Sequence, residues 1–266
     1  MKYIFLLTLI AFELIASTIK APVTAVDLEN DTLTIKIKQI DVGVSGFVVH
    51  HITDEHSSIL KNAVVESFDS ASQSAVIKLS EFDALKNNAL PSGKWNVAVG
   101  DTVELAFGYS RALLLAPSEE IYHKITKSVT VEWIHPDLFA TTLSFAGHPT
   151  PLVEDFVNFS NSMSVGLLFI YLDKRVYTLD IKSFKILNIT EAPFTPKSTK
   201  LPFYTRVEDI DAAWWGEGSD EMQEYAPHYY ELLVEHNPKN RKLYEIINSL
   251  KNENLKYLLD EFQLGK

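Results

Sequence analysis

Hydrophobic and polar residues alternate along much of the first two thirds of the chain. Leu33, Ile35 and Ile37 alternate with threonines and lysines within residues 32–40, and a period of two is typical of a strand with one buried face. Similar short runs recur at residues 46–50, 75–79, 97–99, 103–107, 129–133, 175–181 and 184–189. This pattern predicts about eight to ten short strands in a mainly antiparallel β sandwich or a partly open barrel.

One strand differs from the others because it is apolar almost throughout. Residues 165–172 form this run, and Asp173-Lys174 separates it from the alternating residues 175–181. Two polar residues between two strand patterns predict a hairpin. We therefore expect residues 165–181 to form two paired strands.

Two helices are predicted to interrupt the strands. Ser118 precedes two glutamates, which suits a capping residue followed by acidic side chains at the positive end of the helix dipole. Thr150-Pro151 suits a cap followed by proline in the first turn, and Phe156 and Phe159 follow at helical spacing. Because their spacing is helical, we expect these phenylalanines to face the core.

The composition changes after residue 190. Residues 191–203 contain three prolines and no periodicity, which predicts a linker or an extended edge. Residues 204–266 hold thirteen acidic and seven basic residues, a net charge of −6, and they include two apolar helical patterns. The patterns are Leu243, Ile246, Ile247 and Leu250, then Leu255, Leu258, Leu259 and Phe262. The predicted fold class is α+β, with a C-terminal helical segment after the β-rich part.

The N-terminus has the pattern of an export signal. Lys2 precedes ten largely apolar residues, which is about half the length of a membrane-spanning helix. Glu13 interrupts the run, and small residues follow it. We predict a signal peptide over residues 1–25, with a buried N-terminal helix as the alternative. Because no later run reaches 18 apolar residues, we expect no transmembrane segment after the signal is cleaved.

Charge and composition exclude several functions. The 266 residues carry a formal charge of −11, which disfavours binding to a phosphate backbone, so we expect no nucleic-acid partner. The chain has no cysteine, which excludes disulfides, cysteine-ligated zinc and thiol catalysis. Neither of the common glycine-rich phosphate loops occurs. No cofactor and no metal are therefore predicted, and the oligomeric state stays open.

Histidines provide the candidate sites for metal binding and catalysis. His50, His51, Asp54 and His56 are dense in ligand types, but neighbouring residues of a strand point to opposite faces, which favours a solvated strand end. His135, two residues before Asp137, could act as a general base, although a rigid His-Pro turn is the alternative. Because no nucleophile motif accompanies them, we predict no enzymatic activity and keep a hydrolase as a minor alternative.

Aromatic residues gather near the C-terminal helical segment. Trp214 and Trp215 lie close in sequence to Tyr225, Tyr229 and Tyr230. Such rings beside carboxylates could bind sugars or cations. The favoured interpretation is that all five rings dock the C-terminal segment onto the β-rich part.

Lys266 is the candidate residue for binding a partner. As the last residue of the sequence, it carries an ammonium group and a carboxylate a side-chain length apart, with an apolar stem between them. A pocket with acidic, basic and aromatic groups can bind all three parts at once.

Four segments in the middle of the chain resemble a known family. They are Gly46–His50, Phe107–Pro117, Trp133–Phe139 and Ala146–Leu152. In this order they resemble the N-terminal domain of the plasminogen-binding surface proteins of epsilon-class bacteria. The resemblance implies a β-rich domain over residues 28–190, followed by the linker 191–203 and the acidic helical segment 204–266.

The resemblance also implies a function. Members of this family are exported, and they are held to capture host plasminogen through lysines, notably at the C-terminus. By this resemblance Lys266 would enter a lysine-binding kringle of plasminogen at the cell surface. The alternative is a periplasmic structural or assembly factor that holds an envelope partner with its acidic segment.

Overall fold

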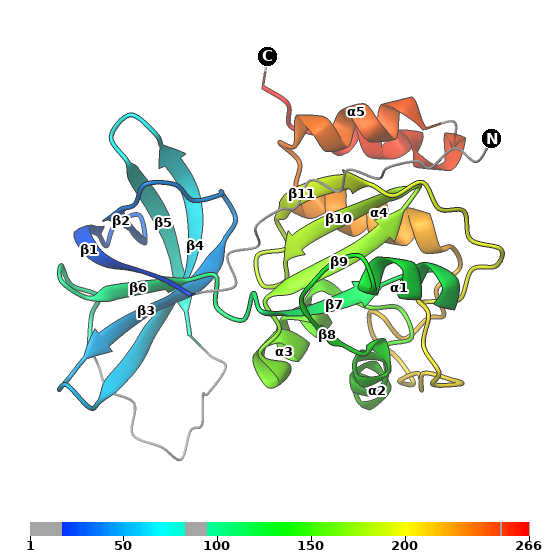
Figure 1. The fold of residues 1–266 in the computed structure, drawn as a ribbon, viewed down its shortest axis with the longest axis horizontal. Coiled ribbons are helices and arrows are strands. Elements are labelled where there is room, and N and C mark those ends of the chain that lie inside the picture. Colours follow the sequence, from blue (N-terminus) through cyan, green and yellow to red (C-terminus); the bar gives the residue numbers. More distant parts are fainter. Residues whose placement is uncertain (1–17, 83–94, 251, 266) are drawn as a thin grey trace, which may run out of the picture.

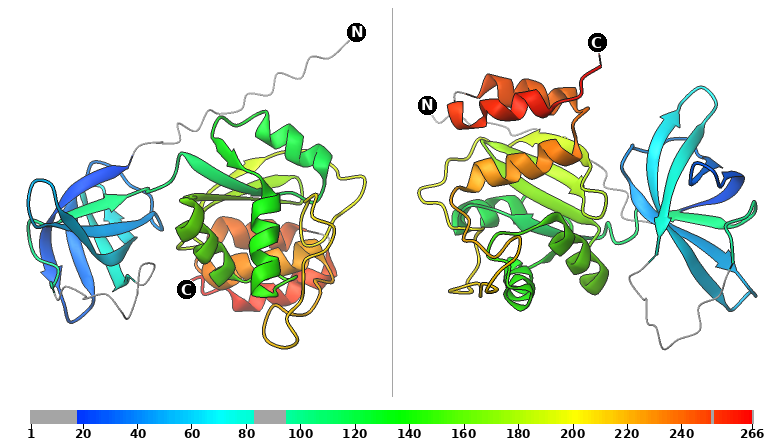
Figure 2. Two further views of the ribbon diagram at one scale, coloured as in Figure 1. Left: turned by 90° about the horizontal axis from the view of Figure 1, so that it is seen from below. Right: turned by 180° about the vertical axis from the view of Figure 1, so that it is seen from behind.

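The computed structural model describes residues 18–82, 95–250 and 252–265. They form two parts that lie side by side (Figures 1 and 2): the barrel, residues 19–105, and the α/β unit, residues 106–265. The predicted α+β class is confirmed. Most of the predicted signal peptide, residues 1–17, lies outside the described residues, as does Lys266.

Six antiparallel strands close the barrel in the order β1-β2-β5-β4-β3-β6. They are β1 (Ile19–Asp27), β2 (Thr32–Lys36), β3 (Ser45–His51), β4 (Ser57–Asp69), β5 (Ser74–Glu81) and β6 (Thr102–Leu105). The first and last strands pair with each other, with Ile19 opposite Leu105. Of the two predicted architectures the barrel is present and fully closed; it holds six strands, and the other strands form a separate mixed sheet.

Alternation along the strands produces the core of the barrel. Leu33 and Ile35 on β2 are buried, whereas Lys36 is exposed. Gly46 lets β3 approach β6 closely, because a Cβ atom at this position would lie 1.9 Å from the carbonyl oxygen of Glu104. A larger residue at position 46 would therefore push these two strands apart.

A five-stranded mixed sheet forms the centre of the α/β unit, in the order β11-β10-β9-β7-β8. Its strands are β7 (Arg111–Leu115), β8 (Glu132–Ile134), β9 (Leu167–Leu172), β10 (Arg175–Asp180) and β11 (Ile186–Glu191). β7 runs parallel to both β8 and β9. The expected β9–β10 hairpin is confirmed, with Asp173 and Lys174 as its turn. All six residues of β9 are buried, which explains the continuous apolar run, since a sheet covered on both faces has no polar face.

Helices cover both faces of this sheet. They are α1 (Glu119–Thr126), α2 (Pro136–Ala146), α3 (Val153–Met163), α4 (Tyr225–His236), α5 (Arg241–Ser249) and the 3-10 helix η1 (Glu253–Glu261). α1 packs with Ala112 and Leu114 of β7, whereas α2, α3 and α4 pack with Leu113 and Leu115. Among the described residues, these helices are too short or too polar to traverse a bilayer.

The helix predictions have three different outcomes. Ser118 caps α1 as expected, since its hydroxyl accepts a hydrogen bond from the main-chain N–H three residues later. The predicted cap at Thr150 is wrong: α3 begins at Val153, and the Thr150 hydroxyl donates to the carbonyl of Asp220 (2.6 Å). The start of α2 at Pro136 was not predicted, although proline is favoured at this position of a helix.

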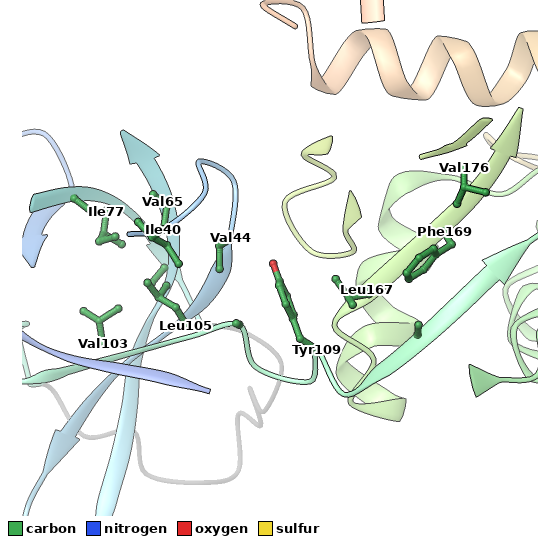
Figure 3. Packing of buried hydrophobic residues seen from close by; sticks show 14 of the residues in the cluster. Ile40, Val44, Val65, Ile77, Val103, Leu105, Tyr109, Leu167, Phe169 and Val176 are labelled. Carbon is green, nitrogen blue, oxygen red and sulfur yellow. The ribbon is translucent and has the colours of Figure 1, made fainter. Parts of the chain in front are cut away.

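A buried carboxylate joins the two parts. Oδ2 of Asp180, at the end of β10, accepts hydrogen bonds from the main-chain N–H and hydroxyl of Ser45 (2.8 and 2.7 Å) and from the phenol of Tyr109 (2.8 Å). Its Oδ1 accepts from the main-chain N–H groups of Lys182 and Ser183. Figure 3 shows Tyr109 between hydrophobic residues of both parts, which belong to one buried cluster. The barrel thus packs against the amino-terminal ends of β7 and β9.

Candidate functional site

The C-terminal segment is anchored up to Gln263. The ring of Phe262 contacts Tyr244 of α5 (centroids 5.3 Å apart), and the main-chain N–H of Gln263 donates to the carbonyl of Pro238 (2.8 Å). Gly265 is exposed, with no atom near its Cβ position, and this segment leads away from the helices (Figure 1). The predicted binding residue, Lys266, lies outside the described residues.

The structure separates the histidines of the barrel. Nδ1 of His50 bonds the buried carboxylate of Asp101 (2.7 Å), and the ring stacks on Trp95. His51 is exposed, and His56 bonds a threonine hydroxyl three residues before it. Within the described ranges, no three histidine or acidic side chains are placed to share a metal ion. His50 therefore links the end of β3 to the loop that precedes β6.

His135 and Asp137 begin α2. Nδ1 of His135 accepts a hydrogen bond from the main-chain N–H of Asp137 (3.2 Å), which caps the helix. The Asp137 carboxylate accepts from the Thr205 hydroxyl (2.8 Å) and from the main chain and guanidinium of Arg206 (2.8 and 2.6 Å). Burial raises the pKa of Asp137, but these hydrogen bonds outweigh it and the net shift is downward. The pair therefore fixes residues 205–206 against α2.

A second histidine–aspartate pair lies at the start of α3. Nδ1 of His148 is 2.9 and 3.0 Å from the two carboxylate oxygens of Asp155. The carboxylate also accepts from the main-chain N–H of Leu152 (2.8 Å) and is buried. This pair likewise holds the beginning of a helix.

The aromatic residues near the C-terminal helices divide into two groups. Tyr225, Tyr229 and Tyr230 are buried on α4, and their hydroxyls bond a carbonyl at the end of β7, the carbonyl of a proline and a tyrosine of β10. Burial raises the pKa of Tyr225 and Tyr229 well above the usual value. Trp214 and Trp215 are 98% and 83% exposed. The docking prediction is confirmed for the tyrosines and wrong for the tryptophans.

A cleft of about 490 Å³ lies at the carboxyl ends of β7 and β9. From these neighbouring strands the chain continues in opposite directions, to β8 and to β10, and ligands commonly bind at such a point of an α/β sheet. Aromatic side chains of Tyr171, Phe194 and Tyr225 line the cleft, and Asp173, Lys174 and Glu224 are exposed at it. These residues come from three separated segments, so the alternation pattern could not bring them together. The arrangement suits an apolar or aromatic group carried by a charged ligand.

Comparison with known proteins assigns the chain to a family. Residues 18–233 match the family model described as the N-terminal region of plasminogen-binding protein pgbA. The chain belongs to this family. The match runs from the residue before β1 into α4, so it includes the barrel, the sheet, Trp214 and Trp215. α5, η1 and Lys266 lie beyond it.

Two curated relatives carry the name plasminogen-binding protein PgbA and come from Helicobacter pylori strains J99 and 26695. Each is 28% identical to this chain over 221 residues, which cover 81% of this chain and 47% of the relative. The chain thus spans about half the length of the curated relatives it matches. No solved structure matches it.

Proposed function

We propose that the chain is an exported, non-enzymatic protein that binds plasminogen. Family membership carries this proposal, together with the name of the two relatives. Export is supported by the apolar run behind Lys2, a pattern typical of signal peptides. Surface display and retention in the periplasm remain two outcomes that an accessibility assay on intact cells distinguishes.

Lys266 is the residue that we propose to contact plasminogen. In this mechanism its ammonium and carboxylate groups fill a lysine-binding kringle, and its apolar stem packs on the aromatic residues of that pocket. The anchor at Gln263 and the open surroundings of Gly265 support the mechanism, since they leave room for a partner beside Gly265.

A single lysine is a small contact. Association costs translational and rotational freedom whatever the area buried, so little binding free energy remains from one side chain. We expect weak binding by one molecule and stronger binding by many copies on one surface, through a raised effective concentration.

The non-enzymatic part of the proposal is supported by the roles of the histidines. His50, His135 and His148 each pair with an aspartate. His135 caps α2, the Asp155 partner of His148 holds the start of α3, and the Asp101 partner of His50 accepts the N–H of Ala98. These aspartates are therefore engaged by the fold itself, which favours structural roles for the three pairs.

Plasminogen binding by the whole chain tests the proposal. The chain ending at Lys266 is compared with the chain ending at Gly265 and with Lys266→Gln, each with and without a soluble lysine analogue. Lys239→Gln is the matched control, because Lys239 is an exposed lysine of the C-terminal helical region. We expect saturable binding that disappears on deletion of Lys266 and on competition, and that survives in the control.

Two other outcomes would change the conclusion. Binding that persists without Lys266 would retain plasminogen as partner and move the contact to the folded part. Absence of binding by every variant would overturn the proposal and favour an envelope structural or assembly factor, held by a bacterial partner.

A further inference from the structure

Three large apolar side chains near the end of α2 are almost fully exposed. Trp214 is 98% exposed, Trp215 83% and Phe145 88%. Single exposed apolar residues are common on protein surfaces, but a group of exposed aromatic rings is typical of an interaction site. The two tryptophans belong to residues 208–221, which we call the tryptophan loop.

Hydrogen bonds hold the tryptophan loop at both ends. On one side the N–H groups of Asp211 and Ala213 donate to a serine hydroxyl (2.8 Å) and a glycine carbonyl (2.9 Å) within residues 144–147. On the other side Thr150 donates its N–H and hydroxyl to carbonyls within residues 218–220 (3.1 and 2.6 Å). Phe145 therefore lies between the residues that anchor the loop. An anchored loop loses less conformational freedom on binding, which favours recognition.

The charge around these rings is negative. The tryptophan loop carries six carboxylates, and residues 207–238 include neither lysine nor arginine. Arg206, the neighbouring cation, is bonded to Asp137. Residues 136–155, on which the loop rests, add three acidic side chains, no lysine or arginine, and His148 paired to an aspartate.

We propose that the tryptophan loop and Phe145 form a docking surface for a protein partner whose contacting face is rich in arginine and lysine. Indole rings bind guanidinium and ammonium groups through their faces, and Trp is the best of the aromatic residues in this role. The surrounding carboxylates complement the same cations and speed their approach. An anionic lipid surface would instead be repelled by the six carboxylates.

This docking surface lies far from residues 263–265, the last described residues of the C-terminal segment. The tryptophan loop sits beside α2, while residues 263–265 lie beside α5 at the opposite side of the α/β unit (Figures 1 and 2). The inference is independent of the proposed function, so either can fail without the other. A partner bound here would leave residues 263–265 uncovered.

The indole N–H signals of the chain test this inference directly. The sequence contains four tryptophans, so a ¹H–¹⁵N spectrum resolves four side-chain signals, which single Trp→Phe variants assign. The probe is a 12-residue peptide of alternating arginine and glycine; its matched control replaces each arginine by neutral citrulline. We expect the arginine peptide to shift the Trp214 and Trp215 signals, to leave those of Trp95 and Trp133 in place, and to bind more weakly as salt is raised.

Variants separate the rings from the overall negative charge. The double variant Trp214→Ala/Trp215→Ala is expected to lower the affinity for the arginine peptide roughly tenfold or more, as loss of aromatic anchors does. Glu217→Gln/Glu221→Gln should lower this affinity less. Trp95→Ala and Glu66→Gln are the matched controls, since they change an exposed ring and an exposed carboxylate of the barrel. All four variants alter exposed side chains, so a thermal melt should show an unchanged fold.

Any of three results would overturn the inference. The first is equal affinity for the arginine and citrulline peptides. The second is unchanged affinity for the arginine peptide after removal of Trp214 and Trp215. The third is a response of the two indole signals of these residues to chitin oligosaccharides or phosphatidylcholine vesicles but not to the peptide. The last result would assign the same rings to a glycan or a lipid surface.

Discussion

The barrel and the α/β unit bury their strands in different ways. Most strands of the barrel, unlike the largely buried β3, have one face toward the core and one toward solvent, as Leu33 and Lys36 of β2 show. The central strands β7 and β9 are covered on both faces, by α1 and buried residues of the barrel on one face and by the other helices on the second. The difference indicates where recognition can arise. The closed barrel pairs its own strand edges, whereas the covered sheet is bordered by exposed loops and by the C-terminal segment. The cleft, the tryptophan loop and the C-terminal segment all belong to the α/β unit.

Loss of β1 should have the largest effect and should break the barrel. A chain that begins at Val26 lacks most of β1, including the buried residues Ala21 and Val23. Because β1 bonds both β2 and β6, its loss opens the barrel and exposes two strand edges. We expect fast amide exchange throughout β2 to β6, while a chain beginning at Thr18 stays protected. Equal protection in both chains would contradict closure by β1.

The position of β1 also limits where an export signal can be cleaved. Cleavage after residue 25 would remove seven residues of β1, which begins at Ile19. We therefore expect any cleavage to precede Ile19, although the pattern of small residues also allows later positions. The intact mass of the exported protein measures the position, and a mature chain starting at residue 26 would contradict the barrel as described.

Removal of the carboxylate at the junction should separate the two parts. Asp180→Ala deprives five donor groups of their acceptor, and buried donors without a partner cost about 1–3 kcal/mol each when they cannot reach water. We expect a loss of about 3 kcal/mol or more in the free energy of unfolding and two urea transitions. Asp54→Ala, at an exposed carboxylate of the barrel, is the control and should unfold like the unaltered chain. A single, unshifted transition for Asp180→Ala would contradict the role of this contact.

A smaller effect should follow from a methyl group between β3 and β6. Gly46→Ala places a Cβ atom 1.9 Å from a main-chain carbonyl, which forces the strands apart. Overpacking of this kind costs about 1–3 kcal/mol of stability, measurable by urea unfolding. Gly265→Ala is the control, because its Cβ meets no atom within 4 Å. Equal stability of the two variants would show that the barrel adapts freely.

The smallest effect concerns pH and the α/β unit. His228 bonds the carbonyl of Pro151 through Nε2 (2.9 Å), and burial lowers its pKa below the usual 6.5. The unfolded chain therefore binds a proton that the folded chain does not, so this contribution to stability is complete above about pH 6.5 and decreases as the pH falls. We expect His228→Gln to reduce the fall in melting temperature between pH 7 and 5. His51→Gln, at an exposed ring, should leave this fall in melting temperature unchanged. An identical fall for His228→Gln and the unaltered chain would contradict the burial argument.

Much of the fold could be predicted from local patterns. Alternation revealed β2, β3, β5 and β6 but not β1 or β4, and Ser118 revealed the start of α1. Both signals depend on neighbouring residues. The parallel pairing of β7 with β8 and β9 could not be predicted, since an apolar run has no periodicity that indicates direction. α2 was missed because His135-Pro136 also suits a turn.

The site was harder to predict for a related reason. Sequence proximity suggested that Trp214, Trp215 and the tyrosines of α4 act together, but the tyrosines are buried while the tryptophans are exposed. The contacts that decide this outcome join residues 211–220 to residues 144–150, far away along the chain. The absence of lysine and arginine over residues 207–238 was the local signal that could have marked this surface.

The pairing of β1 with β6 has a consequence for the order of assembly. All six strands of the barrel lie within residues 19–105, so a chain that emerges amino end first holds everything needed to close it at an early stage. The sheet cannot form as early, because β7 lies between β8 and β9, and β9 ends only at Leu172. We therefore expect Asp180 to bond Ser45 on a barrel that is already complete. The smaller part of the molecule is thus placed to serve as the template on which the larger part is completed.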